Sequence, residues 1–229
     1  MNTNSCDIND KEKSCCSTQV ENEKVDFSKH WNNVYSNSPE EKLGWFETDL
    51  SPTLNLISKT DLKKSARILN VGSGSTTLID ELIGAGYTNL IATDLSSIAL
   101  QKLENRIGEK KIDCIVDDLT QPTVLKKIPP VDLWVDRAVL HFFIEKKDQA
   151  TYFELLNTCI PQGGFVLLAE FSLTSATTCS GLPVHRYSEK MLAEKLVNFE
   201  LIESFEHTYT MPSGAERPYI YTLFKKVKP

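Results

Sequence analysis

A short apolar segment that runs directly into two closely spaced glycines constrains this fold more than any other feature. Residues 67–71 form the apolar segment, Gly72 and Gly74 follow it, and residues 78–85 have the periodicity of an amphipathic helix closed by Gly86. Glycine lets the backbone approach a ligand closely, and the start of a helix offers free N–H groups. The pattern therefore predicts a strand, a nucleotide-binding turn and a helix in succession.

Strand and helix segments alternate through the middle of the chain. Further apolar strands are predicted over residues 89–94, 112–116, 131–135 and 165–169, with helices over residues 96–107 and 147–159. Such alternation is typical of α/β proteins with a Rossmann-like, doubly wound, mainly parallel sheet that is covered on both faces. Residues 199–207 and 219–226 have strand character with little helix between them, which predicts a C-terminal antiparallel hairpin at the sheet edge.

Aromatic residues are concentrated ahead of the first strand. They belong to a predicted helix over residues 27–35, where Ser28 would be the N-cap, and to the loop after it; they are Phe27, Trp31, Tyr35, Trp45 and Phe46. A second helix is predicted over residues 51–60, with Pro52 in its first turn.

The composition limits which partners the chain can bind. At 229 residues it has the size of one domain with a small extension. Its net charge of −6 disfavours the broad basic surface that binds nucleic acid, and no apolar run approaches the roughly 18–20 residues of a membrane span. Residues 1–25 are polar and typical of a disordered head, not of a secretory signal. We therefore expect a cytoplasmic protein that binds neither nucleic acid nor membrane.

The six cysteines do not have the spacing of a metal site. No CxxC pair and no cluster with histidine occurs, so no metal is predicted and the thiols are expected to be reduced. The adjacent Cys15 and Cys16 leave two interpretations open, a soft-metal site or incidental thiols in a solvated tail.

An acidic residue follows the glycines at a spacing typical of nucleotide sites. Asp94 ends the second predicted strand, 22 residues after Gly72 (94 − 72), where a carboxylate can accept hydrogen bonds from both hydroxyls of a ribose. A third glycine would fall at Thr77 and is absent, which counts against a dinucleotide and an NAD-linked oxidoreductase.

At this point the sequence resembles the class I S-adenosylmethionine (SAM)-dependent methyltransferases. The similarity covers about residues 67–169, in five ordered motifs over residues 68–75, 91–96, 116–119, 131–137 and 160–164. The resemblance implies SAM as cofactor, with Asp94 on its ribose and Asp118 on its adenine amino group. The implied cofactor residues of these motifs are Asn70, Gly72, Ser73, Gly74, Asp94, Leu95, Asp118 and Leu119. Asn70 departs from the family pattern, which has an acidic residue there.

Two further segments resemble small-molecule methyltransferases of the thiopurine (thiol) type. Residues 30–35 with 43–46 are similar to their N-terminal lid, and residues 134–138 to their Trp-Asp-Arg-Gly segment with one residue inserted. Residues 179–187 occupy the place of their acceptor loop. The resemblance implies that Trp31 and Tyr35 contact the cofactor; the implied acceptor residues are Trp45, Phe46, Cys179 and Arg186. Some protein-lysine methyltransferases have a similar lid.

Candidate catalytic residues follow the fourth strand: Asp136, Arg137 and His141. Methyl transfer is an in-line displacement that depends mainly on orientation. Arg137 or Arg186 would favour a thiolate without acting as a base. Asp136 would position Arg137, or serve with His141 as a base for a lysine acceptor. The alternatives are an ion pair for each arginine and a core position for His141.

We therefore expect a polar head over residues 1–25 and one methyltransferase domain over residues 26–229. Within that domain, residues 26–62 would form the lid, 66–170 the SAM-binding core, and 171–229 the acceptor loop and hairpin. The favoured function is methyl transfer from SAM to a small molecule, with a thiol as one candidate. The alternatives are a protein-lysine methyltransferase, a methyltransferase for trivalent arsenic bound by Cys179 with Cys159 or the head cysteines, and a SAM-binding protein without catalysis. The oligomeric state is left open.

Overall fold

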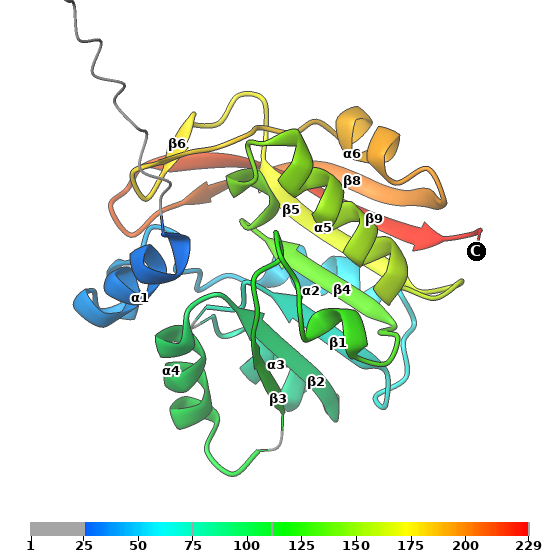
Figure 1. Cartoon of the computed structure of the whole chain (residues 1–229), viewed down its shortest axis with the longest axis horizontal. Coiled ribbons are helices and arrows are strands. Elements are labelled where there is room, and N and C mark those ends of the chain that lie inside the picture. The colour runs from blue at the N-terminus through cyan, green and yellow to red at the C-terminus, as the bar shows by residue number, and fades with distance from the viewer. Residues whose placement is uncertain (1–25, 75, 111, 229) are drawn as a thin grey trace, which may run out of the picture.

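The computed structural model describes residues 26–74, 76–110 and 112–228, so the head predicted over residues 1–25 lies outside them (Figure 1). In the described part of the chain, one seven-stranded sheet has the order β3-β2-β1-β4-β5-β9-β8. Its strands are β1 (Arg67–Val71), β2 (Asn89–Asp94), β3 (Asp113–Val116), β4 (Leu133–Arg137), β5 (Phe165–Phe171), β8 (Phe199–Thr210) and β9 (Glu216–Lys226).

The first five strands are mutually parallel, whereas β9 is antiparallel to both β5 and β8. This arrangement confirms the doubly wound parallel sheet and the C-terminal hairpin that the sequence predicts. The hairpin joins the sheet through β9, so the long strand β8 becomes the edge.

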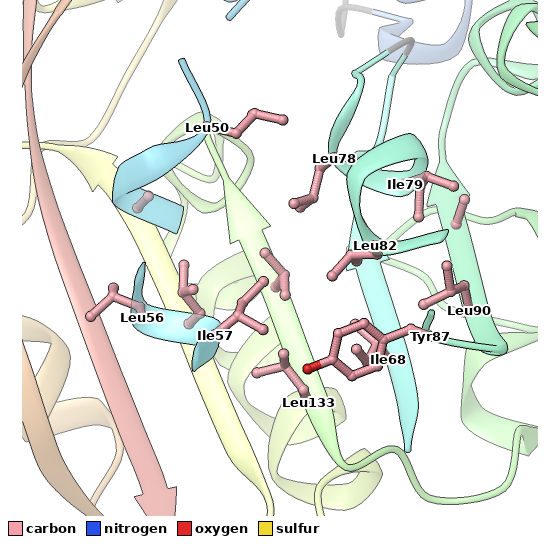
Figure 2. Packing of buried hydrophobic residues seen from close by; sticks show 14 of the residues in the cluster. Leu50, Leu56, Ile57, Ile68, Leu78, Ile79, Leu82, Tyr87, Leu90 and Leu133 are labelled. Carbon is pink, nitrogen blue, oxygen red and sulfur yellow. The ribbon is translucent and has the colours of Figure 1, made fainter. Parts of the chain in front are cut away.

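Helices cover both faces of the sheet. They are α2 (Ser51–Ser58), α3 (Leu78–Gly84), α4 (Ser97–Ile107), α5 (Lys146–Cys159) and α6 (Glu189–Lys195), whereas α1 (Phe27–Asn37) packs on α4. One face packs against α2, α3 and α4, and Figure 2 shows Leu56 and Ile57 of α2 beside Leu133 and Ile68 of the strands. The other face packs against α5 and α6. The central strands β1, β2, β4 and β5 are therefore buried on both sides, which explains their continuous apolar sequences, whereas the edge strands β3 and β8 are partly exposed.

Two predictions of local structure need correction. The N-cap of α1 is Asp26, whose carboxylate accepts a hydrogen bond from the Lys29 N–H at 3.0 Å. Ser28 lies inside the first turn, where its Oγ donates to the Leu95 carbonyl at 3.5 Å. The fourth strand begins at Leu133 and extends to Arg137, not over residues 131–135. The cap is a local contact three residues apart, whereas the limits of β4 follow from its pairing with β1 and β5, which periodicity does not report.

Several short elements were not expected. Residues 179–187 include all but the first residue of a small hairpin of β6 (Thr178–Cys179) and β7 (Leu182–Pro183), and α6 follows with Ser188 as its N-cap. Short 3₁₀ helices occur at η1 (Glu40–Lys42), η2 (Leu125–Lys127) and η3 (Leu140–Phe142).

The strand order places a ligand crevice beside β1 and β4. From β1 the chain proceeds outward to β2 and β3, and then returns to the other side of β1 through β4. In parallel α/β sheets, ligands bind at the carboxyl ends of strands where the order reverses in this way. The glycine loop follows β1 here, and the turn that leads into η3 follows β4. No helix in the described ranges is long and apolar enough to cross a bilayer.

Candidate active site

Both glycines after β1 have backbone angles and surroundings that favour glycine. Gly72 and Gly74 have φ values of 54° and 53°, in the left-handed region. A β-carbon at Gly72 would lie 2.0 Å from Val139 Cγ2, and one at Gly74 would lie 2.4 Å from Tyr35 Oη. The loop is therefore in close contact with the turn after β4 and with α1.

Asp94, at the end of β2, holds this loop in place. Its Oδ2 accepts from the Gly74 N–H at 2.8 Å, and its Oδ1 accepts from the Ser96 N–H at 2.8 Å. Burial raises the pKa of Asp94 to about 6, although these N–H groups oppose the rise. Each carboxylate oxygen keeps a second lone pair, so Asp94 can also accept from a hydroxyl pair.

Two buried polar atoms beside the loop have no hydrogen-bond partner in the described residues: Asn70 Nδ2 and Ser73 Oγ. Buried unsatisfied groups are rare in folded proteins and call for an explanation. Together with the glycine cradle and the Asp94 carboxylate, they fit a ligand such as SAM that carries both a carboxylate and hydroxyls.

The two acidic residues after β3, Asp117 and Asp118, have different roles. Asp117 is buried and accepts from the backbone N–H groups of Thr123, Val124 and Leu125. Asp118 is half-buried, and its Oδ1 accepts from the N–H and the hydroxyl of Thr120 at 2.8 Å each. Asp117 is therefore structural, and Asp118 is the better placed of the two for a ligand. Leu119 is buried toward α5, whereas Leu95 is half-buried after β2.

An aromatic lid lies over the glycine loop. Trp45 Nε1 donates to Tyr35 Oη at 3.2 Å, and the Trp31 ring contacts both Trp45 (5.4 Å between centroids) and Phe142 (5.1 Å). Asn32 ties α1 to the end of β2, because its Oδ1 accepts from the Ser96 hydroxyl at 2.8 Å. The structure therefore brings the predicted residues Trp31, Tyr35 and Trp45 together beside Gly74. Phe46 is joined to β8 through its backbone carbonyl, which accepts a hydrogen bond from the Tyr209 hydroxyl.

Arg137 is enclosed beside this lid by Glu47, Trp45, Tyr209, Tyr219 and Tyr221, and we call this group of side chains the Arg137 chamber. Its Nε forms an ion pair with Glu47 Oε2 at 3.0 Å and donates to Tyr221 Oη at 3.3 Å, and its Nη1 donates to the Trp45 carbonyl at 3.2 Å. The guanidinium carbon lies over the rings of Tyr209 and Tyr219, at 5.0 and 4.9 Å from their centroids. The ion-pair alternative for Arg137 is thus the observed arrangement. Sequence reasoning missed Glu47, whose one signal is its position directly after the aromatic pair of the lid loop.

Asp136 and His141 lie on the opposite face of the sheet and are fully buried. Asp136 accepts from the Tyr152 hydroxyl at 2.6 Å and from the Val139 N–H at 3.0 Å. Glu170 lies on the neighbouring strand β5 and is also fully buried. Its Oε2 lies 2.9 Å from His141 Nδ1 and accepts from the His141 backbone N–H at 3.1 Å. With no exposed surface, neither Asp136 nor His141 reaches an acceptor in this conformation, although both support the turn that contacts Gly72.

Burial sets the charges of Asp136, Glu170 and His141. It raises the pKa of Asp136 well above its usual range, raises the pKa of Glu170 to about 8, and lowers the pKa of His141 to about 3. His141 is therefore a neutral imidazole at pH 7. Glu170 was not predicted from sequence, because an acidic residue inside an apolar strand gives no sign of what it faces.

The predicted acceptor-loop residues differ in their surroundings. Cys179 is half-buried, and burial raises the pKa of its thiol to about 11, so the thiol is neutral. Arg186 holds its own loop, since Nη1 donates to the carbonyls of Leu173 (2.7 Å) and Ser175 (3.2 Å). Cys159 packs on the α5 face of the sheet and Cys179 on the other, so these two thiols do not converge on a metalloid. Within the described ranges no three metal-ligating side chains converge; Cys6, Cys15 and Cys16 lie outside them.

No protein-family model matches this chain, and no curated protein matches it by sequence. Solved structures match it well in fold. A SAM-dependent methyltransferase from Anabaena variabilis is 13% identical, with a TM-score of 0.71 over 87% of this chain and 93% of its own. The 1,6-didemethyltoxoflavin-N1-methyltransferase of Burkholderia thailandensis, solved with S-adenosylhomocysteine, is 16% identical, with a TM-score of 0.63 over 89% and 86%.

The N-methyltransferase NodS from Bradyrhizobium japonicum, also solved with S-adenosylhomocysteine, is 12% identical, with a TM-score of 0.63 over 86% of this chain and 98% of its own. These neighbours are SAM-dependent methyltransferases, and the chain has their Rossmann-like fold. At such low identities the likeness concerns the fold alone.

Proposed function

We propose that this protein is an enzyme that transfers the methyl group of SAM to a small-molecule acceptor. The observation that carries the proposal is the glycine loop after β1, where two positive-φ glycines are held by the carboxylate that ends the neighbouring parallel strand. The fold is shared with methyltransferases that were solved with S-adenosylhomocysteine, which adds support.

The polar groups around the loop suit the three parts of this cofactor. The loop N–H groups, Asn70 Nδ2 and Ser73 Oγ would bind the methionine part, and Asp94 would accept from the ribose hydroxyls. Asp118, with Leu119 behind it, would receive the adenine. SAM supplies an electrophilic methyl group on a sulfonium centre.

The residues of the chain itself contribute orientation and exclusion of water. The contacts of Trp31 with Trp45 and Phe142 close the site from one side, so an acceptor beneath them would be held in a partly dehydrated space. Asp136 and Glu170 hold the turn at Val139 from behind, and this turn defines one wall of the cofactor loop.

The enclosed position of the Arg137 chamber favours a small molecule over a protein side chain as acceptor. A thiol remains a candidate, but the Glu47 carboxylate compensates much of the charge that Arg137 would offer to a thiolate. An experiment is therefore needed to choose between the thiopurine-type function, the protein-lysine alternative and the non-catalytic alternative.

Calorimetric titration with SAM tests whether SAM is the cofactor, and Gly72→Val is the control. The valine β-carbon of this variant would collide with Val139, and residue 72 has a φ that is unfavourable for valine. Wild type should bind SAM, and a variant that is folded by circular dichroism should not. A panel of thiols, amines and protein extracts with SAM, read by mass spectrometry, then identifies the acceptor. A wild-type protein that does not bind SAM would refute the proposal.

A further inference from the structure

We propose that Glu47 and Arg137 together recognise the acceptor, and that this acceptor is a neutral planar molecule with a carboxamide-like edge. On such an edge a carbonyl oxygen lies beside an N–H group. The inference rests on the proposed function and names the acceptor class for the same site.

The pair has one nitrogen and one oxygen atom without a hydrogen-bond partner in the described residues. Arg137 Nη2 and Glu47 Oε1 are both buried, and neither has a hydrogen-bond partner in the described part of the chain. Their remaining atoms are occupied by each other, by Tyr221 and by the Trp45 carbonyl. A buried polar group left unpaired destabilises the fold. A carboxamide edge would supply a carbonyl to Nη2 and an N–H to Oε1, and would satisfy both.

The charges of the pair favour a neutral molecule. The Glu47 side chain is 4% exposed and the Arg137 side chain 13% exposed, and they lie 3.0 Å apart. An anion here would be attracted by Arg137 and repelled by the Glu47 carboxylate. A cation would be attracted by Glu47 and repelled by Arg137. Because a buried charge without a counter-charge is costly, an uncharged ligand is preferred to either ion.

The walls of the chamber are aromatic. The rings of Tyr209 and Tyr219 flank the guanidinium, and the Tyr221 ring stacks on Phe205 with 5.3 Å between centroids and an interplanar angle of 3°. Aromatic surfaces of this kind favour flat ligands through offset stacking and edge contacts.

The chamber adjoins the cofactor loop through one residue. Trp45 donates from its indole to Tyr35, which covers Gly74, while its carbonyl accepts from Arg137. Glu47 belongs to the lid loop and Arg137 to the sheet, so the pair joins the lid to the sheet. An acceptor held by both would be enclosed next to the cofactor, as methyl transfer requires.

Three molecules of one shape test this assignment: benzamide (neutral), benzoate (anionic) and benzamidine (cationic). Their affinities for the protein saturated with S-adenosylhomocysteine would be measured by ligand-observed NMR at pH 7.5. We expect wild type to bind benzamide at least about fivefold more tightly than either ion. Glu47→Gln should shift the preference to benzoate, and Arg137→Met should shift it to benzamidine. Glu203→Gln, which removes a carboxylate paired with Lys59 away from the chamber, should leave the order unchanged.

Three outcomes would overturn the inference: tighter binding of benzoate than of benzamide by wild type, an order that Glu47→Gln does not alter, or binding of none of the three probes. The wild-type order needs no variant, so poor folding of a variant does not protect the inference. Binding of S-adenosylhomocysteine is measured first by calorimetry. Its absence would refute the proposed function, whereas a wrong probe order with the cofactor product bound would refute only the acceptor class.

Discussion

Asp94 combines two roles in one carboxylate. It already accepts from the N–H groups of Gly74 and Ser96, and the proposed function adds the two hydroxyls of a ribose. The pKa of about 6 that burial gives it means that the carboxylate is ionised at neutral pH and becomes protonated under mildly acidic conditions. The affinity for the cofactor should therefore depend on pH through this residue.

Asp94→Ala should weaken SAM binding at least tenfold at pH 8, because hydrogen bonds to a charged acceptor contribute about 1.5–3 kcal/mol each. Wild type should also lose affinity as the pH falls through about 6, whereas the variant should not show this step. Calorimetry from pH 5 to pH 8 measures both effects. The exposed Asp113, at the start of β3, provides a control variant, Asp113→Ala. Equal SAM affinity in Asp94→Ala and wild type would contradict the ribose assignment.

Glu170 allows a prediction about stability. Burial raises its pKa in the folded state to about 8, far above the value of about 4.3 of an unfolded chain. Its contribution to stability is therefore complete below about pH 4 and is lost as the pH rises toward about 8. Glu170→Gln keeps an acceptor for His141 but cannot ionise. Its unfolding free energy should fall less steeply between pH 5 and pH 8, by up to about 1.4 kcal/mol per pH unit.

Urea unfolding of wild type and Glu170→Gln at several pH values provides the measurement. Thr222→Val is a suitable control, because Thr222 is also fully buried and donates to the Leu168 carbonyl, but has no charge. The same slope in all three proteins would show that Glu170 does not hold a proton in the fold.

At the scale of elements, the lid is a separate layer on a sheet that already has its own core. Tyr35, Leu43 and Ala99 form a small cluster with the lid aromatics, apart from the two clusters that cover the sheet. Among the polar contacts that join the lid to the rest, Asn32 of α1 accepts from the Ser96 hydroxyl at the start of α4, and the Trp45 carbonyl accepts from Arg137. Removal of the lid should therefore affect the site more than the fold.

Deletion of residues 1–45 should abolish turnover and leave a folded core, since Trp31, Tyr35 and Trp45 leave with the lid while β1 to β9 remain. Deletion of residues 1–24 should leave activity nearly intact, because this segment is polar and supplies none of the predicted lid residues. Circular dichroism and SAM turnover of both truncations are the measurements. Loss of activity in the shorter deletion would instead indicate a role for Cys6, Cys15 and Cys16.

At the scale of the whole molecule, the cofactor residues come from several segments that only the sheet brings together. The loop after β1, the end of β2 and the turn after β3 would all contact one ligand, and the turn after β4 packs on the first of them. A ligand that binds only this assembly stabilises the fold by mass action, by about 2.7 kcal/mol at 100 times its Kd.

S-adenosylhomocysteine at 100 times its Kd should therefore raise the melting temperature by about 5–10 °C, given about 2–4 °C per kcal/mol for a chain of this size. NAD at the same concentration should have no effect, because the loop has Thr77 where dinucleotide sites have a third glycine. Differential scanning fluorimetry compares the two ligands. A larger shift with NAD would favour an oxidoreductase over the proposed function.

Features that depend on neighbouring residues could be predicted from the sequence alone. The short apolar strands, the glycine turn, the helix periods and the C-terminal hairpin arise from local backbone preferences and from burial on both faces. The parallel pairing of β1 to β5 agrees with the predicted doubly wound sheet. The same local logic identified Asp94 at the end of β2, where it meets the glycine loop, whereas Asp118 was implied by the resemblance to methyltransferases.

The partners of the charged residues were decided by the tertiary structure. Asp136 and Arg137 are adjacent in β4 and therefore point to opposite faces of the sheet, one toward Tyr152 and Glu170 and the other toward Glu47. Segments far away in the chain decide which face of the sheet excludes water and which carboxylate lies opposite Arg137. They also decide which buried carboxyl group keeps its proton. Burial and ion pairing are sums over such distant contacts, so a pattern of neighbours in sequence does not contain them.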